Sequence, residues 1–319
     1  IWIHTFVPGL PMSSLEHNLV CANSLTGIGS VEEGLNALIP DREKFGTSLF
    51  DGLVESSLQE AKTLLEDVAS ADEADKKEAQ KAAQAAKLAR QAAANSKMIF
   101  DVAVANRNGV VSSGAALTES DLEDLASNQE LINLIDAIQP AHMPYLFPEV
   151  FLRSNPGFDV LIGNPPFQEA VVEELEFWNR RFKGLKGASS KDQISEIQRL
   201  RGAYPALALE LEKQRHAMQI LRKALSTGPY PGMGVGDADL YKAFAWRFTG
   251  LCRTDGAIGL VMPHSIWTTK GNGLWRRAFF ESTKSDLVLV LNTKEWAFEN
   301  VNPGYRFTFI GARKNLQET

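Results

Sequence analysis

The sequence has few of the residues that metal centres and disulfide frameworks require. Only two of its 319 residues are cysteine, Cys21 and Cys252, and its five histidines form no spaced pair. Cysteines that lie this far apart argue against a disulfide framework and against a zinc site, so we expect no metal. Scarce cysteine is also typical of proteins in a reducing compartment, and we expect a cytoplasmic protein.

Long apolar runs and an excess of positive charge are also missing. No stretch approaches about 18 uninterrupted apolar residues, so we expect no membrane association. The formal net charge is -6, so no global basic field attracts nucleic acid, although local patches can still bind it. A chain with 44% hydrophobic residues and this length suits two domains, or one domain with a large insertion.

Two long stretches favour helices. Residues 57–97 consist mainly of Ala, Lys, Glu and Gln, which are strong helix formers, within a region from 31 to 145 that has few β-branched residues. Because apolar positions thin out in its middle, we expect an exposed helix or helical hairpin, a surface arm rather than a core element. A second polar, helix-rich stretch covers residues 168–226. Between them, helical spacing predicts one buried face that ends before Pro140, made by Leu122, Leu125, Leu131, Leu134, Ile135 and Ile138.

Short apolar runs predict the strands of a sheet. We expect a short buried strand at Leu19–Cys21 and further strands in 158–163, 257–263, 286–292 and 305–313. A turn is expected at 254–256, directly before the strand at 257–263. Helices separate most of these runs, which indicates an α/β sheet with mostly parallel order. No helix is predicted between the last two strands, so they are expected to be antiparallel neighbours.

One predicted strand ends in an unusual polar corner, FDVLIGNPPF at residues 158–167. Ligand sites in open α/β sheets form at the carboxyl ends of strands. Pro165 and Pro166 stiffen the turn and lack N–H groups, so the corner offers carbonyl acceptors. The side chain of Asn164 and the carbonyl of Pro165 can accept both hydrogens of an exocyclic amine, and Phe167 offers a face on which a base can stack. Together these features suit methyl transfer to the N6 of adenine; the alternative is a rigid turn followed by a core phenylalanine.

The corner and its surroundings, FPEVFLRSNPGFDVLIGNPPF, resemble the catalytic region of S-adenosylmethionine-dependent N6-adenine DNA methyltransferases. The resemblance is to the Asn-Pro-Pro-aromatic family, in particular the large enzymes of restriction-modification and phage-exclusion systems. Residues 3–29, 239–267 and 298–312 agree with the same family. The resemblance implies an α/β fold, a partial Rossmann-like class I methyltransferase sheet with a large helical insertion. The core would begin at 1–30, be interrupted by the insertion at 31–145, and continue over 146–319 with a second insertion at 168–226.

The resemblance also implies roles for particular residues. The catalytic motif would be Asn164, Pro165, Pro166 and Phe167, acting on an adenine flipped out of double-stranded DNA. The adenine of S-adenosylmethionine would be read by Asn23, with Ser24 and Leu25, where the family commonly has an Asp. Restriction or defence-system subunits would be further partners.

One part of the family pattern does not occur in this sequence. The family's Gly-rich cofactor loop and the acidic residue that ends its second strand both precede the IHTF stretch, and neither is found here. We therefore expect the chain to begin inside a longer polypeptide and, by itself, to bind S-adenosylmethionine weakly or not at all.

Further candidates and alternatives remain open. The stretch RRFKGLKGASSK at 180–191 gathers five cations, and Arg180, Arg181 and Lys183 are candidate contacts to DNA phosphates; a solvated loop is the alternative. His264, at a strand end, is interpreted as a structural histidine rather than a base. Methylation of a protein glutamine or of RNA is an alternative function, and a non-catalytic helical interaction module is another.

Overall fold

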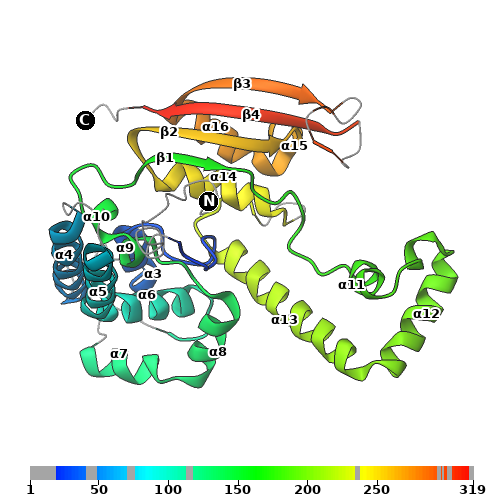
Figure 1. Ribbon diagram of the computed structural model, residues 1–319, viewed down its shortest axis with the longest axis horizontal. Helices are drawn as coiled ribbons and strands as arrows, with labels where there is room; N and C mark the ends of the chain where they lie inside the picture. Colours follow the sequence, from blue (N-terminus) through cyan, green and yellow to red (C-terminus); the bar gives the residue numbers. More distant parts are fainter. Residues whose placement is uncertain are drawn as a thin grey trace.

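The computed structural model describes residues 19–40, 49–69, 76–112, 118–233, 238–292, 296, 298–299 and 304–315. Residues 1–18, where the methyltransferase core is expected to begin, lie outside these ranges. Figure 1 shows three parts: a sheet with its helices, a helical lobe beside one end of it, and a helical arm that projects away from both. None of the described helices has the length and apolar character needed to cross a membrane.

The sheet has four strands in the order β1-β2-β4-β3. β1 pairs with β2 in parallel, and β4 lies between β2 and β3, antiparallel to both. Three strands therefore run in one direction and the last strand runs against them, as the sequence predicts. This α/β arrangement is compatible with part of a Rossmann-like sheet. The strands are β1 (Phe158–Gly163), β2 (Cys252–Pro263), β3 (Thr283–Leu291) and β4 (Arg306–Lys314).

β2 begins earlier than the sequence predicts. The expected turn at 254–256 lies inside the strand, where the pairing with β1 jumps from Phe158–Cys252 to Val160–Ala257. Asp255 has a φ of 62°, a left-handed conformation that aspartate tolerates better than most residues. The Asp-Gly pair therefore lies in an irregularity of the pairing between β1 and β2 instead of before the strand.

Helices cover one face of this sheet. Ile258, Leu260 and Met262 of β2 are buried and form one core cluster with Trp275 and Phe279. This face follows from the alternation of side chains along β2, which sends every second residue to the same side. The covering elements are α14 (Leu240–Leu251), α15 (Ser265–Thr268), η3 (Lys270–Asn272) and α16 (Gly273–Ser282).

The helical lobe contains eight helices among the described residues. The lobe consists of α3 (Val31–Leu38), α4 (Leu49–Ala69), α5 (Lys76–Ala92), α6 (Ala94–Arg107), α7 (Glu119–Ala126), α8 (Gln129–Ile138), α9 (Met143–Leu146) and α10 (Pro148–Phe151). Polar side chains cap helices of this lobe at their starts. Thr118 and Asp121 form a reciprocal capping box before α7, and the Asn128 side chain accepts from Glu130 N at the start of α8.

The expectation of a helical hairpin is confirmed, but the expectation of a surface arm is wrong. Helices α4 and α5 lie side by side (Figure 1). Within the stretch 57–97, Leu58 and Ala61 of α4 and Ala89 of α5 are buried in the largest core cluster of the lobe. Small residues such as Ala89 allow α5 to approach this core closely, so few large apolar residues are needed. The predicted buried face of α8 is confirmed at Leu131, Leu134 and Ile138.

The projecting arm is the second helical insertion. It has a small core of its own, formed by Phe177, Trp178, Leu185, Leu200 and Leu211. Glu174 binds Arg201 at 2.6 Å and Arg215 at 2.8 Å, which ties the three helices together. The arm comprises α11 (Glu174–Arg181), η2 (Leu185–Gly187), α12 (Ser190–Ala203) and α13 (Pro205–Thr227).

The predicted buried strand at Leu19–Cys21 is wrong. These three residues are exposed and lie in no strand. Only Asn23, just beyond them, forms an isolated bridge, to Pro140. A short apolar run becomes a strand only where a neighbouring strand takes its backbone hydrogen bonds, and no described strand lies beside this one.

Candidate functional site

The Asn-Pro-Pro-Phe corner lies where β1 ends, at the edge of the sheet. Asn164 and Pro166 are exposed, and Pro165 is buried. The side chain of Asn164 makes no hydrogen bond with any residue that the structure describes. Gly163 precedes it because a Cβ at this position would lie 2.5 Å from Phe248 Cζ. Gly163, packed against Phe248, and the buried Pro165 thus flank Asn164, whose side-chain amide is exposed at the surface.

Phe167 lies in an aromatic cluster rather than alone. Its ring is parallel to that of Tyr305, with an interplanar angle of 3° and a centroid distance of 6.5 Å. Phe307, which is buried, contacts both rings at 5.9 and 5.2 Å. Tyr305 is 42% exposed and Phe167 is half-buried. The two parallel rings therefore present flat apolar surfaces beside the Asn164 corner.

The chain after Phe167 is anchored at the start of α14. Leu240 N donates to Gln168 O at 3.1 Å, and Ala170 N donates to Ala238 O at 3.0 Å. Next to this anchor lies a cavity of about 710 Å³, with Gln168 and Glu169 on one side and Arg180 and Arg181 on the other. The structure therefore places two of the predicted DNA-contacting arginines close to the segment that follows the motif.

The three predicted DNA contacts differ in their surroundings. Arg181 binds Glu210 at 2.7 Å and its guanidinium lies 3.8 Å from the centre of the Phe177 ring. Arg180 and Lys183 are exposed and form no ion pair with the described residues. Arg181 is thus committed to the packing of the arm, whereas Arg180 and Lys183 are available to a ligand.

The loop from Asn23 to Gly29, which we call the Asn23 loop, contains the predicted cofactor residues. Asn23 Oδ1 accepts from Leu25 N at 3.0 Å, and the backbone of Asn23 bonds to Gln139 and Ala141. Asn23 and Ser24 are half-buried, whereas the side chain of Leu25 is buried in a core cluster. Asn23 and Ser24 therefore remain reachable, and Leu25 contributes mainly packing.

The Asn23 loop and β1 line the same cavity. This cavity has a volume of about 360 Å³ and mostly apolar walls. Its lining includes Ser24 of the Asn23 loop, Phe158 and Leu161 of β1, and Arg247 of α14. The fold thus brings the predicted cofactor loop against the strand that leads to Asn164, although more than a hundred residues separate them in sequence.

His264 follows the end of β2. Its backbone N–H donates to Arg306 O at 3.0 Å, one residue from Tyr305. Its Nδ1 atom is buried without a hydrogen-bond partner among the described residues. The histidine is therefore not fully satisfied by the fold, contrary to the expectation of a purely structural side chain.

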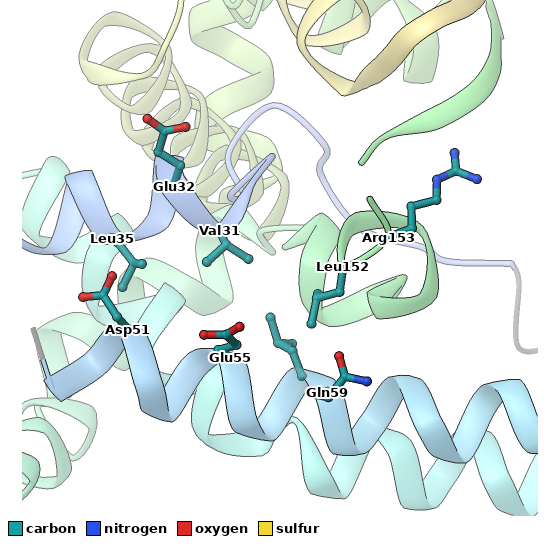
Figure 2. Close-up of a pocket in the computed structure, with 9 residues that line it drawn as sticks. Val31, Glu32, Leu35, Asp51, Glu55, Gln59, Leu152 and Arg153 are labelled. Carbon is teal, nitrogen blue, oxygen red and sulfur yellow. The ribbon is translucent and has the colours of Figure 1, made fainter. Parts of the chain in front are cut away.

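A different cavity, in the helical lobe, contains none of the predicted residues. Figure 2 shows Asp51, Glu55 and Gln59 of α4 opposite Val31 of α3, with Arg153 at one end. Its volume is about 420 Å³. Arg153 is engaged elsewhere, because it binds Asp159 at 3.0 Å. The acidic lining by itself does not define a site. Within the described ranges, no three His, Cys, Asp or Glu side chains are grouped so that they could hold a metal ion.

Sequence reasoning missed Tyr305 and Arg247. Tyr305 directly precedes β4, and the alternation of aromatic residues at Tyr305, Phe307 and Phe309 was a usable signal for it. Nothing in the local sequence marks Arg247, which lies within an apolar helix. Comparison with protein-family models, with curated proteins and with solved structures found no match for this chain.

Proposed function

We propose that this chain forms part of the catalytic domain of an adenine-specific DNA methyltransferase. Such an enzyme transfers a methyl group from S-adenosylmethionine to adenine N6. The observation that carries the proposal is the free amide of Asn164, held on a proline-stiffened corner at the carboxyl end of β1 beside the parallel rings of Phe167 and Tyr305. Amine acceptors beside a stacking surface are what a flipped adenine requires.

The residues of the corner have separate tasks in this proposal. Asn164 Oδ1 and the carbonyl of Pro165 accept the two N6 hydrogens, which turns the nitrogen lone pair out of conjugation with the ring. Phe167 stacks on the base and contributes about 1–3 kcal/mol to its binding. Tyr305, parallel to Phe167, limits the orientations that the base can adopt. S-adenosylmethionine, when bound, supplies the electrophilic methyl group.

The Asn23 loop fits the adenosine half of S-adenosylmethionine. Asn23 Oδ1 accepts from Leu25 N, and its Nδ2 hydrogens donate to none of the residues that the structure describes. The cavity beside Ser24 has mostly apolar walls, which suit a purine ring. None of the described residues at this cavity carries a carboxylate for the methionine amine, so the proposal assigns only the adenosine half to this loop.

The arm is proposed to contact the DNA backbone. Residues 168–227 contain 11 Lys and Arg and 8 Asp and Glu, a net charge of +3 in a chain of net charge -6. Arg180 and Lys183, which are exposed, lie in the part of the arm closest in sequence to the motif. Phosphate contacts of this kind position a protein on DNA without reading its sequence.

Radiolabelled methyl transfer from S-adenosylmethionine to DNA by the full-length protein tests the proposal. We expect label at adenine N6 with the native protein, a loss of about 100-fold or more with Asn164→Ala, and about 10- to 100-fold with Phe167→Ala. Asn133→Ala, an exposed asparagine on α8, is the matched control and should leave transfer unchanged.

The same assay separates the alternatives. Label in protein glutamine or in RNA, with no label in DNA, would replace the DNA substrate. An absence of transfer to all three substrates would favour a non-catalytic interaction module.

A further inference from the structure

The Asn23 loop is held by a buried polar network that none of the site predictions includes. Five of the ten backbone N–H and C=O groups from Leu25 to Gly29 are bonded to side chains that come from elsewhere in the chain. These side chains belong to Arg247 of α14, Tyr230 after α13, Glu33 of α3, Arg107 of α6 and His142. The sheet and the helical lobe therefore meet at this loop.

Arg247 is the centre of the network. Its Nη2 donates to Gly27 O at 2.8 Å, its Nη1 to Glu33 Oε2 at 2.8 Å, and its Nε to the Tyr230 hydroxyl at 2.9 Å. The side chain is 5% exposed. A planar guanidinium presents its donors in a rigid fork that reaches three separated acceptors at once, whereas the donors of a lysine ammonium all lie on one nitrogen atom.

Tyr230 connects Arg247 to a second residue of the loop, Leu25. Its hydroxyl accepts from Arg247 and donates to Leu25 O at 2.6 Å. Burial raises the pKa of Tyr230 to about 12, although Arg247 acts to lower it, so the phenol keeps the proton that it donates at neutral pH.

Glu33 fixes the far end of the loop. It accepts from Gly29 N at 2.9 Å and from Arg107 at 2.9 Å, while Arg107 also donates to Thr26 O at 3.3 Å. Gly29 is required here, because a Cβ would lie 2.2 Å from Arg247 Nη1. The backbone of the loop at Gly29 therefore packs directly against the Arg247 guanidinium.

We propose that Arg247 is a positioning residue that sets the Asn23 loop against the cavity beside β1 and so determines how Ser24, which lines the cavity, and the adjacent Asn23 meet a nucleoside. Arg247 itself lines that cavity together with Ser24 and Leu161. A substitution that moves the Arg247 side chain therefore also alters the cavity wall. The role in cofactor binding rests on the proposed function; the fixing of the loop does not.

Steady-state kinetics on the full-length enzyme test the positioning role. Arg247→Lys should raise the KM for S-adenosylmethionine about 10-fold with less than about a two-fold change in kcat, and Tyr230→Phe should raise it about 3-fold. Arg277→Ala, which removes an exposed arginine paired with Glu281, is the control and should change neither constant. An unchanged KM in the Arg247 and Tyr230 variants, or a fall in kcat alone, would overturn the proposal.

Hydrogen exchange without cofactor or DNA separates this inference from the proposed function. The amides of Ile28 and Gly29 donate to His142 and Glu33 of the network, and the amide of Leu25 donates to Asn23 within the loop. All three should exchange about 10-fold faster in Tyr230→Phe, with amides of α8 unchanged. If the native protein transfers no methyl group, this measurement still decides whether the network holds the loop. Unchanged exchange at those amides would refute it.

Discussion

At the scale of single residues, the position of Asn164 depends on how the residues before and after it in the chain are packed. Phe248 of α14 packs against Gly163, and Pro165 is buried on the other side. The backbone on both sides of Asn164 is therefore constrained, by close packing at Gly163 and by the proline rings that follow. A constrained backbone reduces the entropy cost of binding a ligand at this corner.

Gly163→Ala should disturb this arrangement. Its Cβ would lie 2.5 Å from Phe248 Cζ, so overpacking should lower the free energy of unfolding by about 1–3 kcal/mol and reduce methyl transfer. Gly202→Ala, within α12, has open space around its Cβ and should be neutral or stabilising by up to about 1 kcal/mol. Thermal unfolding of both variants checks the contrast, and equal effects would show that Gly163 is not constrained by Phe248.

His142 predicts a pH dependence of stability. Burial lowers the pKa of His142, although its bond to Asp101 acts to raise it. The neutral ring accepts from Ile28 N at Nδ1 and donates to Asp101 Oδ1 from Nε2 at 2.9 Å. Because the unfolded chain takes up a proton below a pH of about 6.5 and the folded chain resists it, stability should fall as pH decreases from about 6.5.

Replacing this residue tests the dependence. His142→Gln should lower the melting temperature at about pH 8 but flatten its decrease between about pH 6.5 and 5.5. His216→Gln, on α13, is the control. An undiminished slope in the His142 variant would assign the effect to other groups.

At the scale of elements, the arm is a separate structural unit with an exposed basic end. Its helices are joined by Glu174 and by a small core around Trp178, and it leaves the sheet directly after the motif. Figure 1 shows that α12 and the adjoining end of α13 lie far from the sheet. An element with its own core can carry surface charges to a ligand without disturbing the site from which it extends.

The cations of the arm should divide into two groups. Arg180→Gln with Lys183→Gln should weaken DNA binding and reduce the slope of log affinity against log salt by about 0.9 for each phosphate that the protein no longer neutralises. Arg181→Gln should instead lower the stability of the arm, because it breaks the interactions with Glu210 and Phe177. Fluorescence titrations at several salt concentrations check this division. A slope that stays the same in the double variant would remove the arm from the DNA interface.

At the scale of the whole molecule, the two outer strands of the sheet expose apolar residues. Ile162 of β1 is 83% exposed and Val288 of β3 is 58% exposed, on strands with one unpaired edge each within the described sheet. Exposed apolar edge strands promote association through their free backbone groups. The sheet therefore has surfaces that favour pairing or coverage by another strand or chain.

Ile162→Lys should reduce this association. A charge at an exposed edge position opposes edge-to-edge pairing, so we expect less light scattering at equal concentration and an unfolding free energy within about 0.5 kcal/mol of the native value. Ile258→Lys, at a buried position of β2, is the contrasting variant and should destabilise the fold strongly. Unaltered scattering with Ile162→Lys would show that β1 does not mediate association.

The local features of this protein follow from its amino-acid sequence. Helix propensity set the hairpin of α4 and α5, capping residues such as Thr118 and Asn128 set helix starts, and apolar runs set the four strands. The corner at Asn164 was also legible, because glycine and proline restrict the backbone of their own residues and neighbours. Such effects act over a few positions and need no partner elsewhere in the chain.

Contacts between residues far apart in the chain depend on the folded arrangement. Arg247 and Glu33 are 214 positions apart, and Tyr305 lies beside Phe167 only because β4 inserts next to β2. Leu19–Cys21 has the composition of a strand but no described neighbour, whereas the alanine-rich hairpin has a surface composition but packs against a core. Burial and hydrogen bonding depend on what the folded chain places opposite each residue, and a local pattern does not contain that information.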